Sequence, residues 1–222
     1  MKIEQFHVII LSAGRKGGFS MSNIIITIGR EFGSGGRIIG EKLAARLGIS
    51  FYDKELIQLA AEKSGIHADV LKGADEVAAN PFSSPFVPPS IDQGSLNDKL
   101  YKYQRDVIRE IASRESCVIV GRCADYILKD YPNCIRVFIY ADMEYKVKLI
   151  MERHHLKDTE LIEKIIRRTD KNRRTYYQYY TDHKWGAREE MDLLIDSSLL
   201  GVDGTVDLLE KAARLKMEQA EA

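Results

Sequence analysis

A glycine-rich segment directly after the first apolar run contains the residues best suited to chemistry. Residues 24–28 are four isoleucines and a threonine, and Gly33, Ser34, Gly35 and Gly36 follow closely. A backbone that turns tightly between a buried strand and a helix needs glycine. Such a turn directs consecutive N–H groups inward, and the following helix adds the positive end of its dipole. We therefore predict that these four residues bind phosphate groups through backbone donors.

The same segment approaches the Walker A pattern but lacks its lysine and its hydroxyl. The pattern is Gly, four residues, Gly, Lys, then Ser or Thr. With Gly35 as the second glycine, Gly36 stands in the lysine place and Arg30 in the place of the first glycine. A shift by one residue puts Arg37 in the lysine place and Ile38 in the hydroxyl place. Because an arginine also brings positive charge to phosphate, we predict that Arg37 replaces the lysine. The alternative is a packing turn that binds nothing.

Two further polar residues stand at the ends of strand-like segments. Arg122 follows the apolar residues 117–120 and Gly121. A guanidinium in that place can hold a phosphate or a carboxylate through two parallel bonds, so we predict that it binds substrate rather than being an ordinary surface arginine. Asp53 is the last of the strand-like residues 50–53. It suits the N-cap of the next helix, and equally a contact to a substrate sugar or base or to magnesium-bound water.

An arginine-rich stretch lies within a helix predicted from residue 158 to about 180. Residues three and four apart share one face of a helix, and an aspartate and an arginine three apart can also pair. Mobile arginines that close over a phosphoryl group would account for the excess of cations, whereas a solvated charged face is the alternative. We predict a lid over about 155–182. The residues that share one face of its helix are Arg167, Asp170, Arg174 and Tyr177, and the predicted pair is Asp170 and Arg173. The predicted catalytic residues of the lid are Arg167, Asp170, Arg173 and Arg174.

Strand-like and helical segments alternate along the chain, which implies an α/β fold with a parallel sheet covered on both faces. Ligands of such folds bind beyond the carboxyl ends of the strands, where the glycine loop, Asp53 and Arg122 all fall. A proline-rich segment over 79–93 predicts an irregular loop near the site. The further predicted strands are 117–121, 135–140 and 191–196, and the predicted helices are 36–47, 54–64, 66–77, 96–113, 143–152, 158–180 and 205–220.

The amino-acid composition narrows the classes of protein to which this chain can belong. With 33 basic and 33 acidic residues in 222, no net field attracts nucleic acid or an anionic membrane. The three cysteines show no CxxC spacing, do not form a zinc set and fit a reducing cytoplasm. No metal-binding histidine pattern and no apolar run of membrane-spanning length is present. We therefore expect a cytoplasmic protein without a nucleic-acid or membrane partner.

The first twenty residues raise the question of where translation of this protein begins. Residues 21–23 lead directly into the first strand, as a natural start would. The codons of residues 16–20 can contain a purine-rich ribosome-binding sequence at a suitable distance before an ATG. We hypothesise that Met21 is the biological start and that residues 1–20 are a non-native or disordered extension.

Four segments together resemble the cytidylate kinase-like branch of the nucleoside monophosphate kinases: 29–37, 51–57, 118–125 and 170–177. The resemblance extends from about Ile24 to Leu209. It implies a three-layer P-loop kinase fold in a single domain over 21–222, with a helical acceptor region at about 66–98 and the arginine lid. It also implies ATP and Mg²⁺ as cofactors and nucleotides as substrates.

The resemblance also implies roles for individual residues. Cytidylate kinases hold the acceptor nucleotide with Gly-Arg-Asp at a strand end, a motif that Arg122 matches and Cys123 breaks. Asp170 and Arg173 match the Asp-x-x-Arg element of their lid, and Asp53 matches their strand-end aspartate. The implied function is ATP-dependent phosphoryl transfer to a nucleoside monophosphate, with CMP or dCMP favoured. A kinase for another small acceptor and a nucleotide-binding regulator without turnover are the alternatives.

Overall fold

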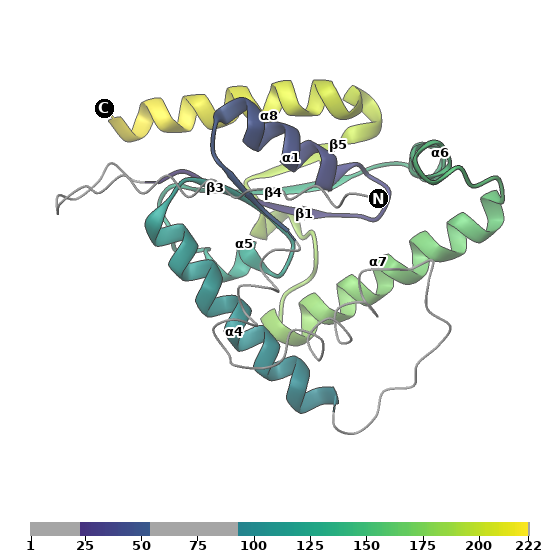
Figure 1. The fold of residues 1–222 in the computed structure, drawn as a ribbon, viewed down its shortest axis with the longest axis horizontal. Helices are drawn as coiled ribbons and strands as arrows, with labels where there is room; N and C mark the ends of the chain where they lie inside the picture. The colour runs from purple at the N-terminus through teal and green to yellow at the C-terminus, as the bar shows by residue number, and fades with distance from the viewer. Residues whose placement is uncertain (1–22, 54–92, 222) are drawn as a thin grey trace, which may run out of the picture.

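The chain folds around a five-stranded parallel sheet with the strand order β2-β3-β1-β4-β5. The structure, a computed structural model, describes residues 23–53 and 93–221 (Figure 1). The strands are β1 (Ile25–Arg30), β2 (Ser50–Tyr52), β3 (Cys117–Val120), β4 (Cys134–Tyr140) and β5 (Leu193–Asp196). All five are parallel, so their carboxyl ends meet at one edge of the sheet.

Helices cover both faces of this sheet. In Figure 1, α1 and α8 lie on one face, and α4 and α5 lie on the other. The helices are α1 (Gly36–Leu47), α4 (Gln93–Arg114), α5 (Ala124–Ile127), α6 (Met143–His154), α7 (Thr159–Thr181), the 3₁₀ turn η1 (Arg188–Glu190) and α8 (Ser197–Glu221). The predicted three-layer α/β architecture is therefore confirmed for the described part of the chain.

The central position of β1 follows from its continuous apolar sequence. Ile26 and Ile28 point into the core beneath α1 and α8, whereas Ile25 points into the core on the α4 and α5 side. A strand that is buried on both faces needs apolar residues at every position, not only at alternate ones. β3 is built in the same way and is fully buried from Cys117 to Val120.

The boundaries of the described helices lie within three residues of the predicted ones except at the carboxyl end of the chain. α1 ends at Gly48, whose left-handed φ of 66° makes it the helix cap, as its sequence position indicates. The helix predicted to begin at 205 begins eight residues earlier in the structure, with Ser197 of α8. Gly201 has non-helical angles and separates two helical pieces there. The sequence pattern detects the second piece alone, because the first is shorter than two helical turns.

Several predictions lie outside the described residues. These are the extension over 1–20, the start at Met21, the helices at 54–64 and 66–77, the proline-rich loop and all but the end of the acceptor region at 66–98. Among the helices that the structure does describe, none is both long and apolar enough to cross a bilayer.

Two tyrosines in the carboxyl half of α7 fix this helix to α4 and α5. The Tyr177 hydroxyl donates to Asp125 Oδ2 at 2.6 Å, and burial raises the pKa of that carboxyl. The ring of Tyr180 stacks on Tyr101 of α4 at a centroid distance of 4.1 Å. α7 is therefore tied to two elements that the chain reaches before it, α4 and α5.

Replacing Tyr177 by phenylalanine should lower the free energy of unfolding by about 1–3 kcal/mol, because a buried Asp125 oxygen loses its donor. Urea unfolding measures the change. Tyr179→Phe is the matched control, since this tyrosine is 69% exposed on the same helix. Equal stability of both variants and the wild type would contradict a stabilising role of the Tyr177–Asp125 bond.

Candidate active site

The loop between β1 and α1 has the conformation that its glycines predict. Gly33 and Gly35 adopt left-handed φ angles of 86° and 79°, which favour glycine. A Cβ at Gly33 would also lie 2.9 Å from Ile150 Cδ1 and 3.0 Å from Lys146 Cβ, so no side chain fits there. The loop leads into the twelve-residue α1, whose amino end adds a positive dipole. The loop thus makes the tight turn that its glycines predict, and we call residues 31–36 the phosphate loop after the ligand predicted for it.

The Ser34 side chain supports this loop from inside the protein. It is fully buried, and its hydroxyl lies 2.9 Å from the Glu31 carbonyl oxygen and 3.2 Å from that of Ile139 in β4. The Ser34 carbonyl in turn accepts from the Ser197 hydroxyl at 2.7 Å. Ser34 therefore holds the loop against the ends of β4 and β5, and it contributes to the loop's shape rather than a free hydroxyl.

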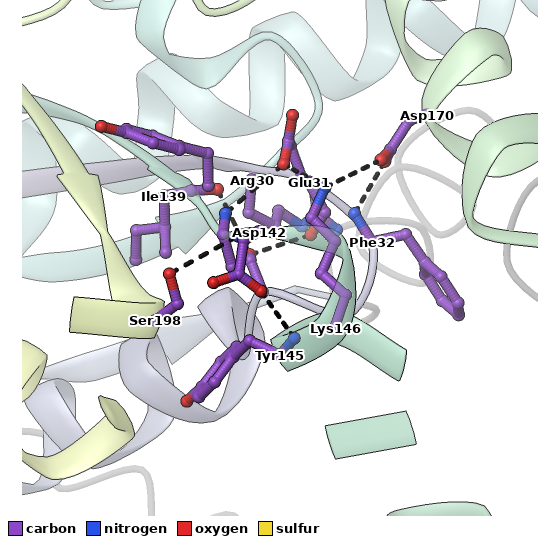
Figure 2. Close-up of polar contacts among 12 residues, drawn as sticks. Arg30, Glu31, Phe32, Ile139, Asp142, Tyr145, Lys146, Asp170 and Ser198 are labelled. Atoms are coloured by element: carbon purple, nitrogen blue, oxygen red, sulfur yellow. Dashed lines mark hydrogen bonds and ion pairs between the residues drawn. The ribbon is translucent and has the colours of Figure 1, made fainter. Parts of the chain in front are cut away.

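Acidic and basic side chains join this loop to α6 and α7 (Figure 2). The Phe32 N–H donates to Asp170 Oδ1 of α7 at 2.7 Å. The buried Lys146 of α6 forms an ion pair with Glu31, and its Nζ lies 3.9 Å from Asp170 Oδ2. One carboxylate of α7 is thus bonded directly to the backbone of the phosphate loop.

Burial of Asp170 has a consequence for stability. Loss of solvent raises its pKa from 3.8 to about 6, although the Phe32 N–H, Arg173 and Lys146 act in the opposite direction. Between these values the folded chain binds more protons than the unfolded chain, so stability falls as the pH rises from about 4 to 6. Above that window both states are ionised, and this contribution becomes constant.

In Asp170→Asn, this fall should be absent. Relative to the wild type, the variant should gain about 3 kcal/mol or less as the pH rises from 4 to 7. Urea unfolding of both proteins across this range measures the difference. Asp182→Asn, an exposed position just beyond α7, controls for the substitution itself. Parallel pH profiles for wild type and Asp170→Asn would contradict this assignment.

Arg173 is the arginine of α7 that reaches the phosphate loop. Its Nη1 donates to the Arg30 carbonyl oxygen at 3.0 Å, and its Cζ lies 5.6 Å from the centre of the Phe32 ring. The same Nη1 is 3.9 Å from Asp170 Oδ1, which confirms the predicted pair. Burial lowers the pKa of this guanidinium, and Arg122 lowers it further.

The structure does not bring two members of the predicted stripe of α7 to the phosphate loop. Arg167 is exposed and pairs with Glu163 one turn away at 3.2 Å, and Arg174 is exposed as well. Ile162 and Ile166 fix the buried face of the helix, and this face continues through Asp170 and Tyr177. Arg173 lies near the centre of this buried face, whereas Arg167 and Arg174 lie outside it.

Arg37 and Asp53 meet at the end of β2. The Arg37 Nε donates to Asp53 Oδ2 at 2.7 Å, and its Nη1 lies 3.8 Å from Glu41 one turn along α1. The guanidinium also lies over the Phe51 ring, with 5.9 Å from Cζ to the ring centre. Asp53 is only 6% exposed. The charge of Arg37 is thus directed to a buried carboxylate at the end of β2.

Arg122 lies in an unusual turn after β3. Gly121, Arg122 and Cys123 all have left-handed φ angles, of 81°, 59° and 55°. The Ala124 N–H donates to the Gly121 carbonyl at 3.1 Å and closes the turn. Non-glycine residues in this region cost about 1–3 kcal/mol each, and such strain is concentrated at functional sites. Cys123 is buried, and burial raises the pKa of its thiol, which disfavours the reactive thiolate.

Arg30 is a site residue that the sequence interpretation missed. Its side chain is 20% exposed, and its Nη2 lies 3.8 Å from Asp53 Oδ1. Burial lowers its pKa to about 9, and the nearby charges of Arg173, Arg122 and Arg37 act in the same direction. Four arginines, from β1, α1, the turn after β3 and α7, therefore gather at the carboxyl edge of the sheet.

Lys146 was also missed, although the sequence carries a signal for it. It is placed on the same helical stripe as Met143, Val147 and Ile150, where an apolar residue is expected. A lysine on the apolar face of a helix indicates a buried ion pair, which the structure shows with Glu31.

Within residues 23–53 and 93–221, no group of three histidine, cysteine or carboxylate side chains is arranged to hold a metal ion. The hydroxyl group of Ser34 in the phosphate loop lies within hydrogen-bonding distance of two backbone carbonyl oxygens. The described residues therefore do not form a protein cage for Mg²⁺.

Known proteins share this architecture. A crystal structure of an uncharacterized protein from Eubacterium ventriosum is 35% identical, with a TM-score of 0.65, and the match covers 86% of this chain and 99% of that one. A shikimate kinase from Bacteroides thetaiotaomicron is 13% identical with a TM-score of 0.50, covers 86% of this chain and 98% of that chain, and shares the fold.

The sequence comparisons lead to the same group of proteins. A cytidylate kinase from Archaeoglobus fulgidus is 26% identical over 197 residues, which cover 86% of this chain and 95% of that protein. The cytidylate kinase-like family model matches residues 25–199, which include the phosphate loop, Arg122 and the whole of α7. The chain belongs to the cytidylate kinase-like family and is a nucleoside monophosphate kinase-like phosphotransferase with the P-loop kinase fold.

Proposed function

We propose that this protein transfers a phosphoryl group from ATP to a nucleoside monophosphate, with CMP or dCMP as the favoured acceptor. One observation carries the proposal. Arg30, Arg37, Arg122 and Arg173 gather beside the phosphate loop, and the charges of the other three lower the pKa of Arg30. So many cations in one place repel each other and favour a polyanionic ligand. Two bound nucleotides would bring at least four phosphate groups to this edge of the sheet.

The roles follow from position. Backbone donors of Gly33–Gly36, with the amino end of α1, would bind the phosphates of ATP. Arg122 would hold the phosphate of the acceptor, beside Asp53 at the end of the neighbouring strand β2. Arg173 would stabilise charge on the transferring group, and Asp170 would orient Arg173 through their contact of 3.9 Å. Catalysis would depend on positioning and electrostatics, without a covalent nucleophile.

Mg²⁺ would enter with ATP. This ion keeps several water ligands and commonly uses one or two carboxylates with substrate phosphates rather than an all-protein cage. When bound, it would neutralise charge between the phosphates of the donor. The residues of the chain would then act on the phosphate oxygens through the arginines and the loop.

The choice of a cytidine nucleotide is supported by the relatives from Archaeoglobus fulgidus and Methanosarcina barkeri, which are 26% and 24% identical and are both named cytidylate kinase. Cys123 departs from the Gly-Arg-Asp motif of cytidylate kinases at this point of the sequence.

A coupled assay of ADP formation with every ribo- and deoxyribonucleoside monophosphate tests the proposal. We expect the highest kcat/KM with CMP or dCMP. Turnover with another small phosphorylated or hydroxylated acceptor, and none with nucleoside monophosphates, would replace it with a different kinase activity. ATP binding without transfer to any acceptor would identify a nucleotide-binding regulator instead.

A further inference from the structure

The lysine place of the phosphate loop is occupied by a glycine, and the structure shows what fills the space above it. With Gly35 as the second Walker glycine, Gly36 stands in the lysine place and Arg30 in the place of the first glycine. These two positions are in contact in the fold. A Cβ added at Gly36 would lie 2.6 Å from Arg30 Cβ and 3.0 Å from Arg30 Cγ. The Arg30 side chain thus occupies the position from which a lysine at 36 would extend.

A second glycine accommodates the other end of this side chain. A Cβ added at Gly121, directly after β3, would lie 2.0 Å from Arg30 Nη1 and 3.0 Å from its Cζ. Arg30 therefore passes from Gly36 to Gly121, across the carboxyl ends of the paired strands β1 and β3. We name this space the Arg30 slot, formed by Gly36 and Gly121. A side chain at Gly36 would displace the Cβ and Cγ of Arg30, and one at Gly121 would displace its guanidinium.

The electrostatic surroundings of Arg30 differ from those of Arg37. Arg37 has a direct bond to Asp53 at 2.7 Å, and its side chain is 37% exposed. Arg30 has Asp53 at the longer distance of 3.8 Å, and it lies among Arg173, Arg122 and Arg37. Bonding to a phosphate oxygen would relieve the repulsion among these cations. Arg30 is thus the more weakly neutralised cation and the one adjoining the lysine place.

We infer that Arg30 supplies to the polyphosphate of a nucleoside triphosphate the cation that lysine supplies in Walker loops, and that Gly36 and Gly121 are glycines because Arg30 passes between them. The two residues have in effect exchanged places, with the charge moved from position 36 to position 30. This inference rests on the proposed function, because it assumes a nucleoside triphosphate in the phosphate loop. It assigns the lysine role to Arg30 rather than to Arg37.

The test is binding of ATP and of inorganic tripolyphosphate by isothermal titration, in the absence of any acceptor. We expect Arg30→Gly to weaken both ligands about 30- to 100-fold, the loss of one charged hydrogen-bonding group. Gly36→Lys alone should also bind weakly, because its side chain meets Arg30. The double variant Arg30→Gly/Gly36→Lys restores the Walker arrangement and should bind within about tenfold of the wild type.

Arg46→Ala, in the last turn of α1 and paired with Asp207 of α8, is the control and should bind as the wild type does. Thermal unfolding of each variant separates lost binding from lost folding. Wild-type affinity in Arg30→Gly, or no recovery in the folded double variant, would overturn the inference. Because binding is measured without an acceptor, either result stands apart from the proposed function, which fails only if the wild type transfers no phosphoryl group to a nucleoside monophosphate.

Discussion

Replacing Arg173 by alanine is expected to lower kcat about 100- to 1,000-fold while changing the KM of both substrates little. Arg173 is the arginine of α7 that reaches the phosphate loop, where it donates to the Arg30 carbonyl at 3.0 Å. A cation that meets charge developing on the transferring phosphoryl group acts in the transition state and not in the ground state. The loss should therefore appear in kcat.

The measurement is steady-state kinetics with ATP and the best acceptor of the coupled assay. Lys171→Ala is the matched control, because this exposed cation lies two residues away on the same helix. It removes one positive charge from α7 without altering the contact to the loop, so its kcat should stay near that of the wild type. A similar kcat in Arg173→Ala and Lys171→Ala would contradict a direct role of Arg173, and a rise in KM alone would assign it to substrate binding.

Replacing Arg122 by alanine is expected to raise the KM of the acceptor about 100-fold and to leave the KM of ATP nearly unchanged. A charge-assisted contact to a phosphate is worth about 1.5–3 kcal/mol, and Arg122 follows β3, which pairs with β2 on the Asp53 side, and is not part of the loop that would hold ATP. Arg122→Lys retains the charge but loses the planar fork, so we expect an intermediate rise of about tenfold.

Initial rates with each substrate varied in turn separate the two KM values. The strained turn at Arg122 and Cys123 makes a check of folding necessary, and thermal unfolding provides it. A larger rise in the KM of ATP than in that of the acceptor would place Arg122 on the donor side and contradict its proposed role.

The prediction for the lid shows how far sequence spacing can go. The pairing of Asp170 with Arg173 was predicted and is confirmed at 3.9 Å, because three residues on a helix are neighbours in any context. The choice of Arg167 and Arg174 depended on which side of the helix faces the protein, and the structure leaves both side chains exposed. That side is fixed by the packing of Ile162 and Ile166, and the charged residues alone do not reveal it.

The roles within the arginine cluster could not be predicted for a related reason. Arg30 and Gly121 are separated by 90 residues of sequence and touch only because β3 pairs beside β1 in the sheet. The sequence shows both residues, and its alignment with the Walker pattern puts Arg30 in the place of the first glycine. The contact between Arg30 and Gly121 depends on strand order, which local sequence patterns do not encode.

The sequence by itself determined the alternation of strands and helices, the parallel sheet and the tight glycine turn after β1. These features depend on local backbone preferences and on burial patterns that repeat within one strand or one helix. The tertiary structure alone decided which arginines gather and which carboxylate each one meets. Arg37 was expected at the phosphates and lies on Asp53, whereas Arg30 lies across Gly36 and Gly121. Guanidinium groups reach several ångströms from their backbone, so their partners are set by the packing of elements that are distant in sequence.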